Sequence, residues 1–273
     1  MNQKTDVQSE RPSWVIDAVS EGWETTRLVE AYFHHSELQR QWAWEALGLV
    51  GLHPNQQILD FGCGDGKITA CLSRLVGEGR VVGLDASPTM IDFCRTKFPA
   101  ASYPRLDYVS ENLGGFAQSR REAFDLVTSF CVFHLVPEPR GVLEHLKSVL
   151  RKEGTLLLVI PAGDDNPVLF ETAEECFKSF GLPCPWEEGK LFRSQSSMVS
   201  VDGCRNILEK AGFRVDHLAR ATNPTVFVDE RELINWMVGT LSANWLVSYE
   251  MSQDFFSKLV NDAVAREIGR AHV

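Results

Sequence analysis

Short apolar segments alternate with longer segments of helical periodicity over the first 160 or so residues. The apolar segments predict five strands, at 57–61, 80–85, 106–110, 123–130 and 154–160. Apolar residues spaced three or four apart between them predict helices over 68–76, 88–98 and 137–150. Strands that are apolar throughout, and separated by helices, are typical of a parallel sheet buried on both faces. The pattern therefore predicts a doubly wound α/β fold with a mostly parallel sheet.

The two flanks of this region follow a different pattern. Residues 28–50 have helical spacing, and 229–271 predict further helices with a Trp-rich apolar face. Between them the sequence predicts a helix at 201–211 and a sixth strand at 212–218. Residues 224–228 either form a short return strand beside it, which we favour, or the sheet lacks its last strand and the edge of the sixth is uncovered. We therefore expect three parts: an N-terminal helical cap segment (1–54), a core (55–228) with a helical cap insert (163–200), and a C-terminal helical extension (229–273).

Charge narrows the classes of function. Lys and Arg number 27 against 37 Asp and Glu, so the formal net charge is −10, which disfavours a nucleic-acid partner. The longest strongly apolar run, 156–160, is too short to span a membrane, and no secretory signal is predicted at the N-terminus. Seven cysteines at irregular spacings, with no CxxC, indicate reduced thiols and predict no metal site. We expect a cytoplasmic protein.

A glycine-rich turn follows the first predicted strand. Gly62, Gly64 and Gly66 allow the backbone to turn sharply and to approach a ligand, and Asp85 ends the second strand, where ribose-binding carboxylates are found. A dinucleotide fingerprint requires glycine at position 67, which is lysine here. The carboxylate of Asp60 would repel a pyrophosphate but attract the ammonium of an amino acid. The turn therefore favours S-adenosylmethionine over NAD.

Four motifs occur in an order and spacing that resemble those of Rossmann-like class I S-adenosylmethionine-dependent methyltransferases. They are Asp60-Phe-Gly-Cys-Gly-Asp-Gly66, Val81-Val-Gly-Leu-Asp85-Ala-Ser-Pro-Thr-Met90, Phe124-Asp-Leu-Val-Thr-Ser129 and Leu150-Arg-Lys-Glu-Gly154. Within that superfamily, the chain is similar to the small-molecule branch around trans-aconitate and juvenile-hormone acid methyltransferases. That finer resemblance depends on Tyr32, Ser36 and Gln39 and on the segments 133–136 and 227–245.

The resemblance implies roles for individual residues. Asp60 would hold the methionyl ammonium, directly or through water, the three glycines would line the methionine and ribose, and Asp85 would bind the ribose hydroxyls. Either Glu111 or Asn112 would bind the adenine amino group. The remaining expected cofactor contacts are Tyr32, Gln39, Cys63, Ala86, Met90 and Phe130.

The acceptor is less well defined by the sequence. Methyl transfer from a sulfonium is an in-line displacement that depends mainly on orientation, so a carboxylate acceptor needs no base. A phenol or amine would need one, and His134 is the candidate. The Pro-Pro-aromatic motif typical of nucleic-acid amino methyltransferases is replaced by Ser129-Phe130-Cys131-Val132.

We therefore expect O-methylation of a carboxylate or hydroxyl on a small, apolar or carboxylic substrate, by a monomer or weak homodimer. Two alternatives stay open at this point. One is a catalytically silent methyltransferase-like domain with a binding or regulatory role, and the other is an NAD-type oxidoreductase.

Overall fold

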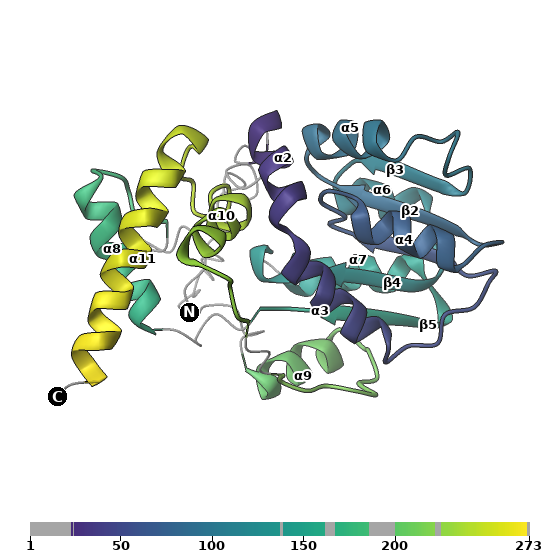
Figure 1. Cartoon of the computed structure of the whole chain (residues 1–273). Helices are drawn as coiled ribbons and strands as arrows, with labels where there is room; N and C mark the ends of the chain where they lie inside the picture. Colours follow the sequence, from purple (N-terminus) through teal and green to yellow (C-terminus); the bar gives the residue numbers. More distant parts are fainter. Residues whose placement is uncertain are drawn as a thin grey trace, which may run out of the picture.

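The structure is a computed structural model that describes residues 23, 25–136, 139–161, 167–185, 200–221 and 225–271. Its centre is a five-stranded sheet in the order β3-β2-β1-β4-β5, with every neighbouring pair parallel (Figure 1). The strands are β1 (Gln57–Phe61), β2 (Arg80–Asp85), β3 (Leu106–Ser110), β4 (Phe124–Phe130) and β5 (Leu150–Val159). The first five predicted strands and the parallel, doubly wound architecture are thus confirmed.

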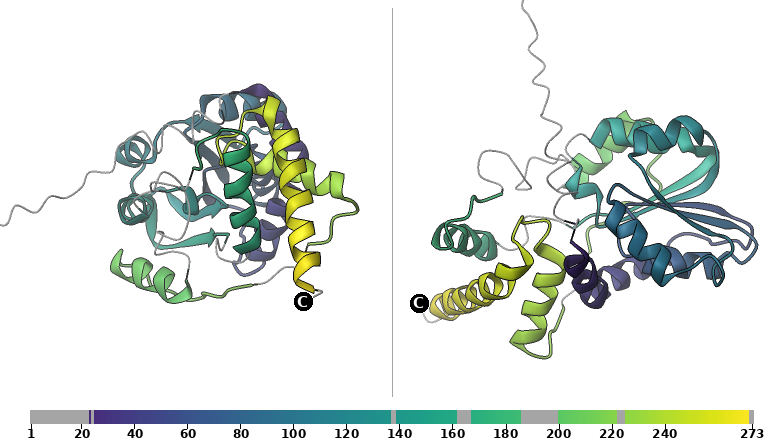
Figure 2. Two further views of the ribbon diagram at one scale, coloured as in Figure 1. Left: turned by 90° about the vertical axis from the view of Figure 1, so that its left-hand side faces the viewer. Right: turned by 90° about the horizontal axis from the view of Figure 1, so that it is seen from above.

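Helices cover both faces of this sheet. One face carries α3 (Glu37–Leu47), α4 (Lys67–Leu75) and α5 (Pro88–Lys97), and the other carries α6 (Leu113–Ser119), α7 (Pro139–Val149) and α9 (Val201–Lys210). The view from above in Figure 2 shows the sheet between its two helical layers. The helix α5 begins with Pro88 after the N-cap Ser87, whose hydroxyl accepts a hydrogen bond from the amide of Met90 at 3.2 Å.

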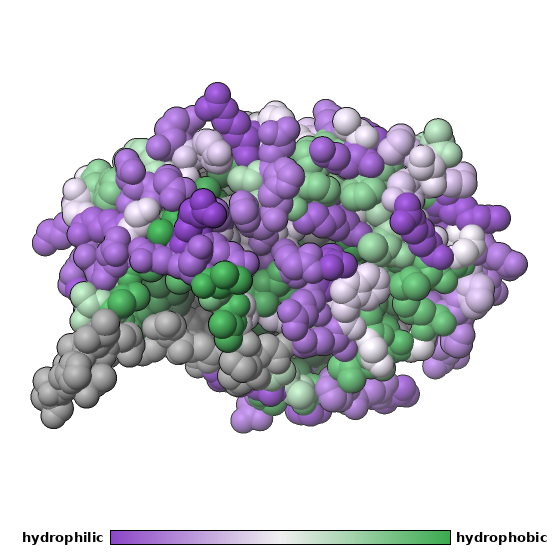
Figure 3. Space-filling view, viewed as in Figure 1, coloured by the Kyte–Doolittle hydropathy of each residue, from purple (hydrophilic) through white to green (hydrophobic). Residues whose placement is uncertain are grey.

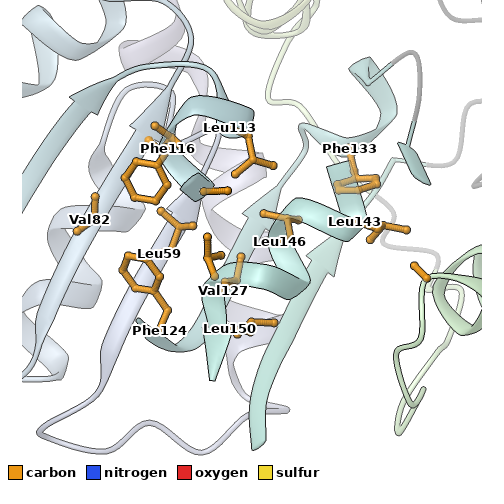
Figure 4. Close-up of a cluster of buried hydrophobic side chains, with 14 of the residues drawn as sticks. Leu59, Val82, Leu113, Phe116, Phe124, Val127, Phe133, Leu143, Leu146 and Leu150 are labelled. Carbon is orange, nitrogen blue, oxygen red and sulfur yellow. The ribbon is translucent and has the colours of Figure 1, made fainter. Parts of the chain in front are cut away.

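Two apolar clusters fill the spaces between sheet and helices. The one shown in Figure 4 joins residues of β1, β2, β4 and β5 to α6 and α7, with Phe133 of the short 3-10 helix η1 (Phe133–Leu135) at one end. The other cluster fills the opposite face and includes Ile58, Leu72 and Ile91, all fully buried. The strands β1 and β4 are apolar at successive positions because helices cover both of their faces.

The other helices form a separate body. Three helices, α8 (Pro167–Ser179), α10 (Glu230–Leu241) and α11 (Tyr249–Ala271), share an apolar cluster that includes Phe177, Phe255 and Phe256. Figure 1 and the view from above in Figure 2 place this body beside the sheet rather than on either of its faces. It contacts the core through α10, which packs on α2 (Thr26–His35). The face of the molecule in Figure 3 is mostly hydrophilic, so these clusters lie beneath it.

Two predicted strands are wrong. Residues 212–218 form no strand, and neither do 225–228, the described part of the predicted return. Val226 and Val228 are 91% and 90% exposed, and Arg214 pairs with Asp216 in solvent. A strand is stable only where a neighbour pairs with it, and among the described residues none pairs with either segment.

The helix α6 was not predicted, since the sequence analysis assigned no element between the third and fourth strands. Of the predicted cap insert, residues 167–185 and 200 are described, and the remainder lies outside the described residues, as do 1–22 and 24 of the N-terminal segment. None of the helices in the described part of the chain has the length and apolar character needed to cross a membrane.

Candidate active site

The glycine turn has the backbone conformation that its sequence predicts. Gly62, Gly64 and Gly66 all have positive φ, at 71°, 51° and 75°, and side-chain-bearing residues rarely adopt such angles. A Cβ at Gly62 would lie 2.3 Å from Cγ2 of Val132, so the loop after β4 packs directly on the turn. The turn and the carboxyl end of β4 therefore form one surface at the edge of the sheet where ligands of doubly wound folds bind.

Asp60, at the carboxyl end of β1, is held between a helix and a strand. Its side chain is 2% exposed and accepts hydrogen bonds from Oγ1 of Thr69 at 2.7 Å and from Oγ1 of Thr128 at 2.8 Å. Burial raises the pKa of Asp60 to about 6, although the two hydroxyls act in the opposite direction. The carboxylate is thus oriented but poorly stabilised, a state that a bound cation would relieve.

Asp85, at the end of β2, is tied to the turn and to the next helix. One carboxylate oxygen accepts from the amide of Gly64 at 3.0 Å and the other from the amide of Ser87 at 2.9 Å. Burial raises the pKa of Asp85, and these backbone hydrogen bonds partly offset that effect. Each oxygen keeps a second lone pair, so both can still accept from a vicinal diol. The capping role and a ligand role are compatible.

A small cavity of about 20 Å³ lies between the turn and α2–α3. Of the predicted site residues, the structure brings Tyr32, Gln39, Asp60, Gly62, Cys63 and Phe130 together around it. Gln39 is 9% exposed, and its Oε1 has no hydrogen-bond partner among the described residues. A buried acceptor without a donor, next to a carboxylate and a glycine turn, fits the ammonium end of S-adenosylmethionine.

Other predicted residues lie along the same sheet edge but do not line this cavity. Glu111 and Ala86 are exposed, and the amide of Glu111 donates to the carbonyl of Asp85 at 3.2 Å. Asn112 is the N-cap of α6, and its side chain accepts from the amide of Gly115 at 2.8 Å. That hydrogen bond leaves Glu111 as the better of the two adenine candidates. Met90 is 3% exposed in the first turn of α5.

His134 lies in η1, two residues after the Val132 that contacts Gly62. Burial lowers its pKa to about 4, so the imidazole is neutral at physiological pH. Cys131, at the end of β4, has a positive φ of 57°. Burial raises the pKa of Cys131 to about 12, and the thiol therefore stays protonated.

Sequence reasoning missed a polar group on the same cavity. Asp65 is 5% exposed and accepts from Oγ of Ser36 at 2.6 Å, and Lys67 lies 3.5 Å from the same carboxylate. The only signal in the sequence was the position of Asp65 inside the glycine turn. Arg40 and Ile68 complete the missed part of the lining.

Known proteins match both the turn and the fold. Residues 59–158 match the family described as "Methyltransferase domain". Trans-aconitate 2-methyltransferase of Escherichia coli strain 55989 is 26% identical over 215 residues, which cover 79% of each chain. The enzyme of strain K12 / DH10B is 26% identical over 228 residues, covering 83% of this chain and 84% of the relative.

Among solved structures, the methyltransferase in a complex with the Trm112 methyltransferase activator of Haloferax volcanii has a TM-score of 0.51 at 17% identity. The match covers 92% of this chain and 96% of the other, and it shows a shared fold.

These matches, together with the parallel sheet and the glycine turn, identify the chain as a class I S-adenosylmethionine-dependent methyltransferase, with S-adenosylmethionine as its cofactor. Within that class it resembles trans-aconitate 2-methyltransferase. This result favours the methyltransferase interpretation over a silent domain or an NAD-type oxidoreductase.

Asp60→Asn should stabilise the unliganded protein at neutral pH. Because the folded protein holds the proton of Asp60 up to about pH 6, against about 4 in the unfolded chain, its free energy of unfolding falls as the pH rises between these values. The asparagine variant has no such proton to lose, so its free energy of unfolding should not fall over this pH range. We expect it to equal that of the parent at pH 4 and to exceed it by about 2–3 kcal/mol at pH 7. Urea unfolding at both pH values tests this, and an equal or lower stability of Asp60→Asn at pH 7 would contradict it.

Asp85→Asn should weaken binding of S-adenosylmethionine by about 2 kcal/mol, or about 30-fold, since charge-assisted hydrogen bonds to the ribose would be lost. Isothermal titration calorimetry measures the change, and unfolding of the unliganded variant reports the capping role separately. Asp107→Asn, an exposed carboxylate on the neighbouring strand β3, is the matched control. Equal affinity of Asp85→Asn and the parent would remove Asp85 from the binding site.

Proposed function

We propose that the protein transfers the methyl group of S-adenosylmethionine to a carboxylate oxygen of a small organic acid. The observation that carries this proposal is the position of His134 in η1, two residues after the Val132 that contacts the glycine turn, where burial lowers its pKa to about 4. Such an imidazole would leave a phenol or an ammonium protonated at neutral pH, whereas a carboxylic acid is already ionised there. A carboxylate is thus the acceptor that can be methylated here without a base to remove a proton.

Two further features support an acid acceptor. The curated relatives described above are named trans-aconitate 2-methyltransferase, and their names indicate activity on a carboxylic acid. The end of β4 and the residues after it read Ser129-Phe130-Cys131-Val132 and lack the Pro-Pro-aromatic motif. The formal charge of −10 also disfavours nucleic acid.

The proposed roles of the site residues follow from their positions. Asp60 and Gln39 face the cavity where the methionyl ammonium would lie, and the carboxylate of Asp85 holds the turn in the position to receive the ribose. His134 would act as a neutral hydrogen-bond partner that orients the acceptor. Orientation of the two reactants can supply about 7–11 kcal/mol of the barrier reduction, so no strong base is required.

The acceptor class can be tested with labelled S-adenosylmethionine and a panel of carboxylic acids, phenols and amines. We expect base-labile methyl esters of acids such as trans-aconitate, and a kcat/KM that stays level from pH 7 to 9 at saturating cofactor. Methylation of phenols or amines at a higher kcat/KM than any acid would contradict the proposal.

His134→Gln separates orientation from base catalysis in the same assay. Glutamine keeps hydrogen-bonding capacity, so we expect less than about a tenfold loss with an unchanged pH profile, whereas loss of a general base costs about 100-fold or more. His145→Gln, an exposed histidine on α7, is the matched control. A loss above 100-fold confined to His134→Gln would assign it the role of a base.

A further inference from the structure

The cavity at the glycine turn is much smaller than a cofactor. Its volume of about 20 Å³ is enough for about one water molecule, whereas pockets for organic ligands measure about 300–1,000 Å³. The helices α2 and α3 close it from above, and Tyr32 of α2 lies so near that its Cε1 would be 3.6 Å from a Cβ at Gly64. The methionyl end of S-adenosylmethionine, for which this cavity is the proposed site, therefore has little room unless α2 shifts away from the turn.

Three polar side chains, which we call the latch, hold α2 in this position. Ser36 lies at the junction of α2 and α3 and donates its hydroxyl to Asp65 of the turn at 2.6 Å. Lys67, the first residue of α4, donates its ammonium to Oγ of Ser36 at 2.9 Å and lies 3.5 Å from the Asp65 carboxylate. The amide of Lys67 donates to the other oxygen of Asp65 at 3.1 Å.

Lys67 also holds the end of α2 itself. Its ammonium donates to the carbonyl of Phe33, in the last turn of α2, and lies 4.4 Å from the centroid of the Phe33 ring. Carbonyls at the end of a helix lack helical partners, and a cation near them is favourable. With 19% of the Lys67 side chain and 7% of the Asp65 side chain exposed, water screens this ion pair weakly. The latch is therefore a strong local constraint on α2.

The opposite side of α2 is fixed by α10. A Cβ at Gly239 would lie 2.8 Å from the carbonyl oxygen of Ala31 and 2.9 Å from Cβ of His35, so the two helices are in backbone contact. Since α10 belongs to the body formed with α8 and α11, a displacement of α2 has to move α10 or slide against it. The helix α2 is thus held on one side by its packing against α10 and on the other by the latch. The three latch residues line the same cavity as Tyr32 and Gln39.

We propose that Ser36, Asp65 and Lys67 are positioning residues that hold α2 with Tyr32, and the start of α3 with Gln39, over bound S-adenosylmethionine, and that this latch opens to admit the cofactor. The proposal rests on the cofactor site described above. It assigns a role to Lys67, which stands where a dinucleotide fingerprint requires glycine.

Lys67→Met tests the latch directly, with S-adenosylhomocysteine as the ligand. We expect about tenfold faster dissociation of the ligand and about tenfold weaker binding, measured by stopped-flow and calorimetry. Amide hydrogen exchange over residues 26–39 should become faster in the unliganded variant. In the methyl-transfer assay the KM for S-adenosylmethionine should rise about tenfold while kcat changes less than threefold.

Two further variants keep the test decisive if an unpaired Asp65 prevents folding. The double variant Asp65→Asn/Lys67→Met removes both charges, leaves no uncompensated buried carboxylate, and should reproduce the faster dissociation. Lys67→Arg keeps the cation and should restore most of the parent affinity. Adding Ser36→Ala to the double variant should cause little further loss, because the three residues act as one unit.

Lys97→Met is the matched control. The ammonium of Lys97 lies 5.4 Å from the same Phe33 ring, but the side chain is exposed on α5 and makes no contact with the turn. Dissociation rates and exchange over 26–39 that stay at parent values in both the double variant and Lys97→Met would overturn the latch. Failure of the parent to bind S-adenosylhomocysteine would instead overturn the cofactor site itself.

Discussion

The site depends on a carboxylate that the fold buries at the end of its first strand. Asp60 is 2% exposed and is held by Thr69 of α4 and Thr128 of β4, so one side chain joins β1, the helix that follows it and the neighbouring strand of the sheet. The raised pKa of Asp60 shows that this burial is unfavourable for the charged form. Natural sites often keep such groups at a cost in stability because a ligand recovers the loss. Here the ligand that fits is a cation.

The chain that follows Asp60 builds the rest of the site. After β1 the chain passes through three glycines with positive φ, packs against Val132 and continues into α4. The helix α4 places Thr69 against Asp60 and Lys67 against the end of α2. In the proposed function, the methyl acceptor would approach along the loop after β4, where His134 is neutral. Binding of the donor and approach of the acceptor are both controlled by side chains that contact or follow the glycine turn.

Much of this could be predicted from the sequence because it is local. The strand β1, the turn and Asp85 lie within about 30 residues, and glycines and buried strands have strong local signals. The latch has no such signal, since Ser36 and Asp65 are 29 positions apart and meet only in the folded chain. The helix α6 was missed because Gly114 and Gly115 lower its helical propensity. The predicted strands over 212–218 and 224–228 had suitable composition, but strand formation also requires a paired neighbour.

The central claim is that Asp60 receives the positive charge of the cofactor, and calorimetry at pH 6 in buffers of different ionisation enthalpy tests it most directly. At that pH about half of the Asp60 side chains carry a proton in the unliganded protein, so binding of a cationic amino acid group should release about half a proton per site. We predict this release for S-adenosylhomocysteine binding to the parent and its absence in Asp60→Asn. Binding without proton release in the parent, or with the same release in Asp60→Asn, would contradict the account.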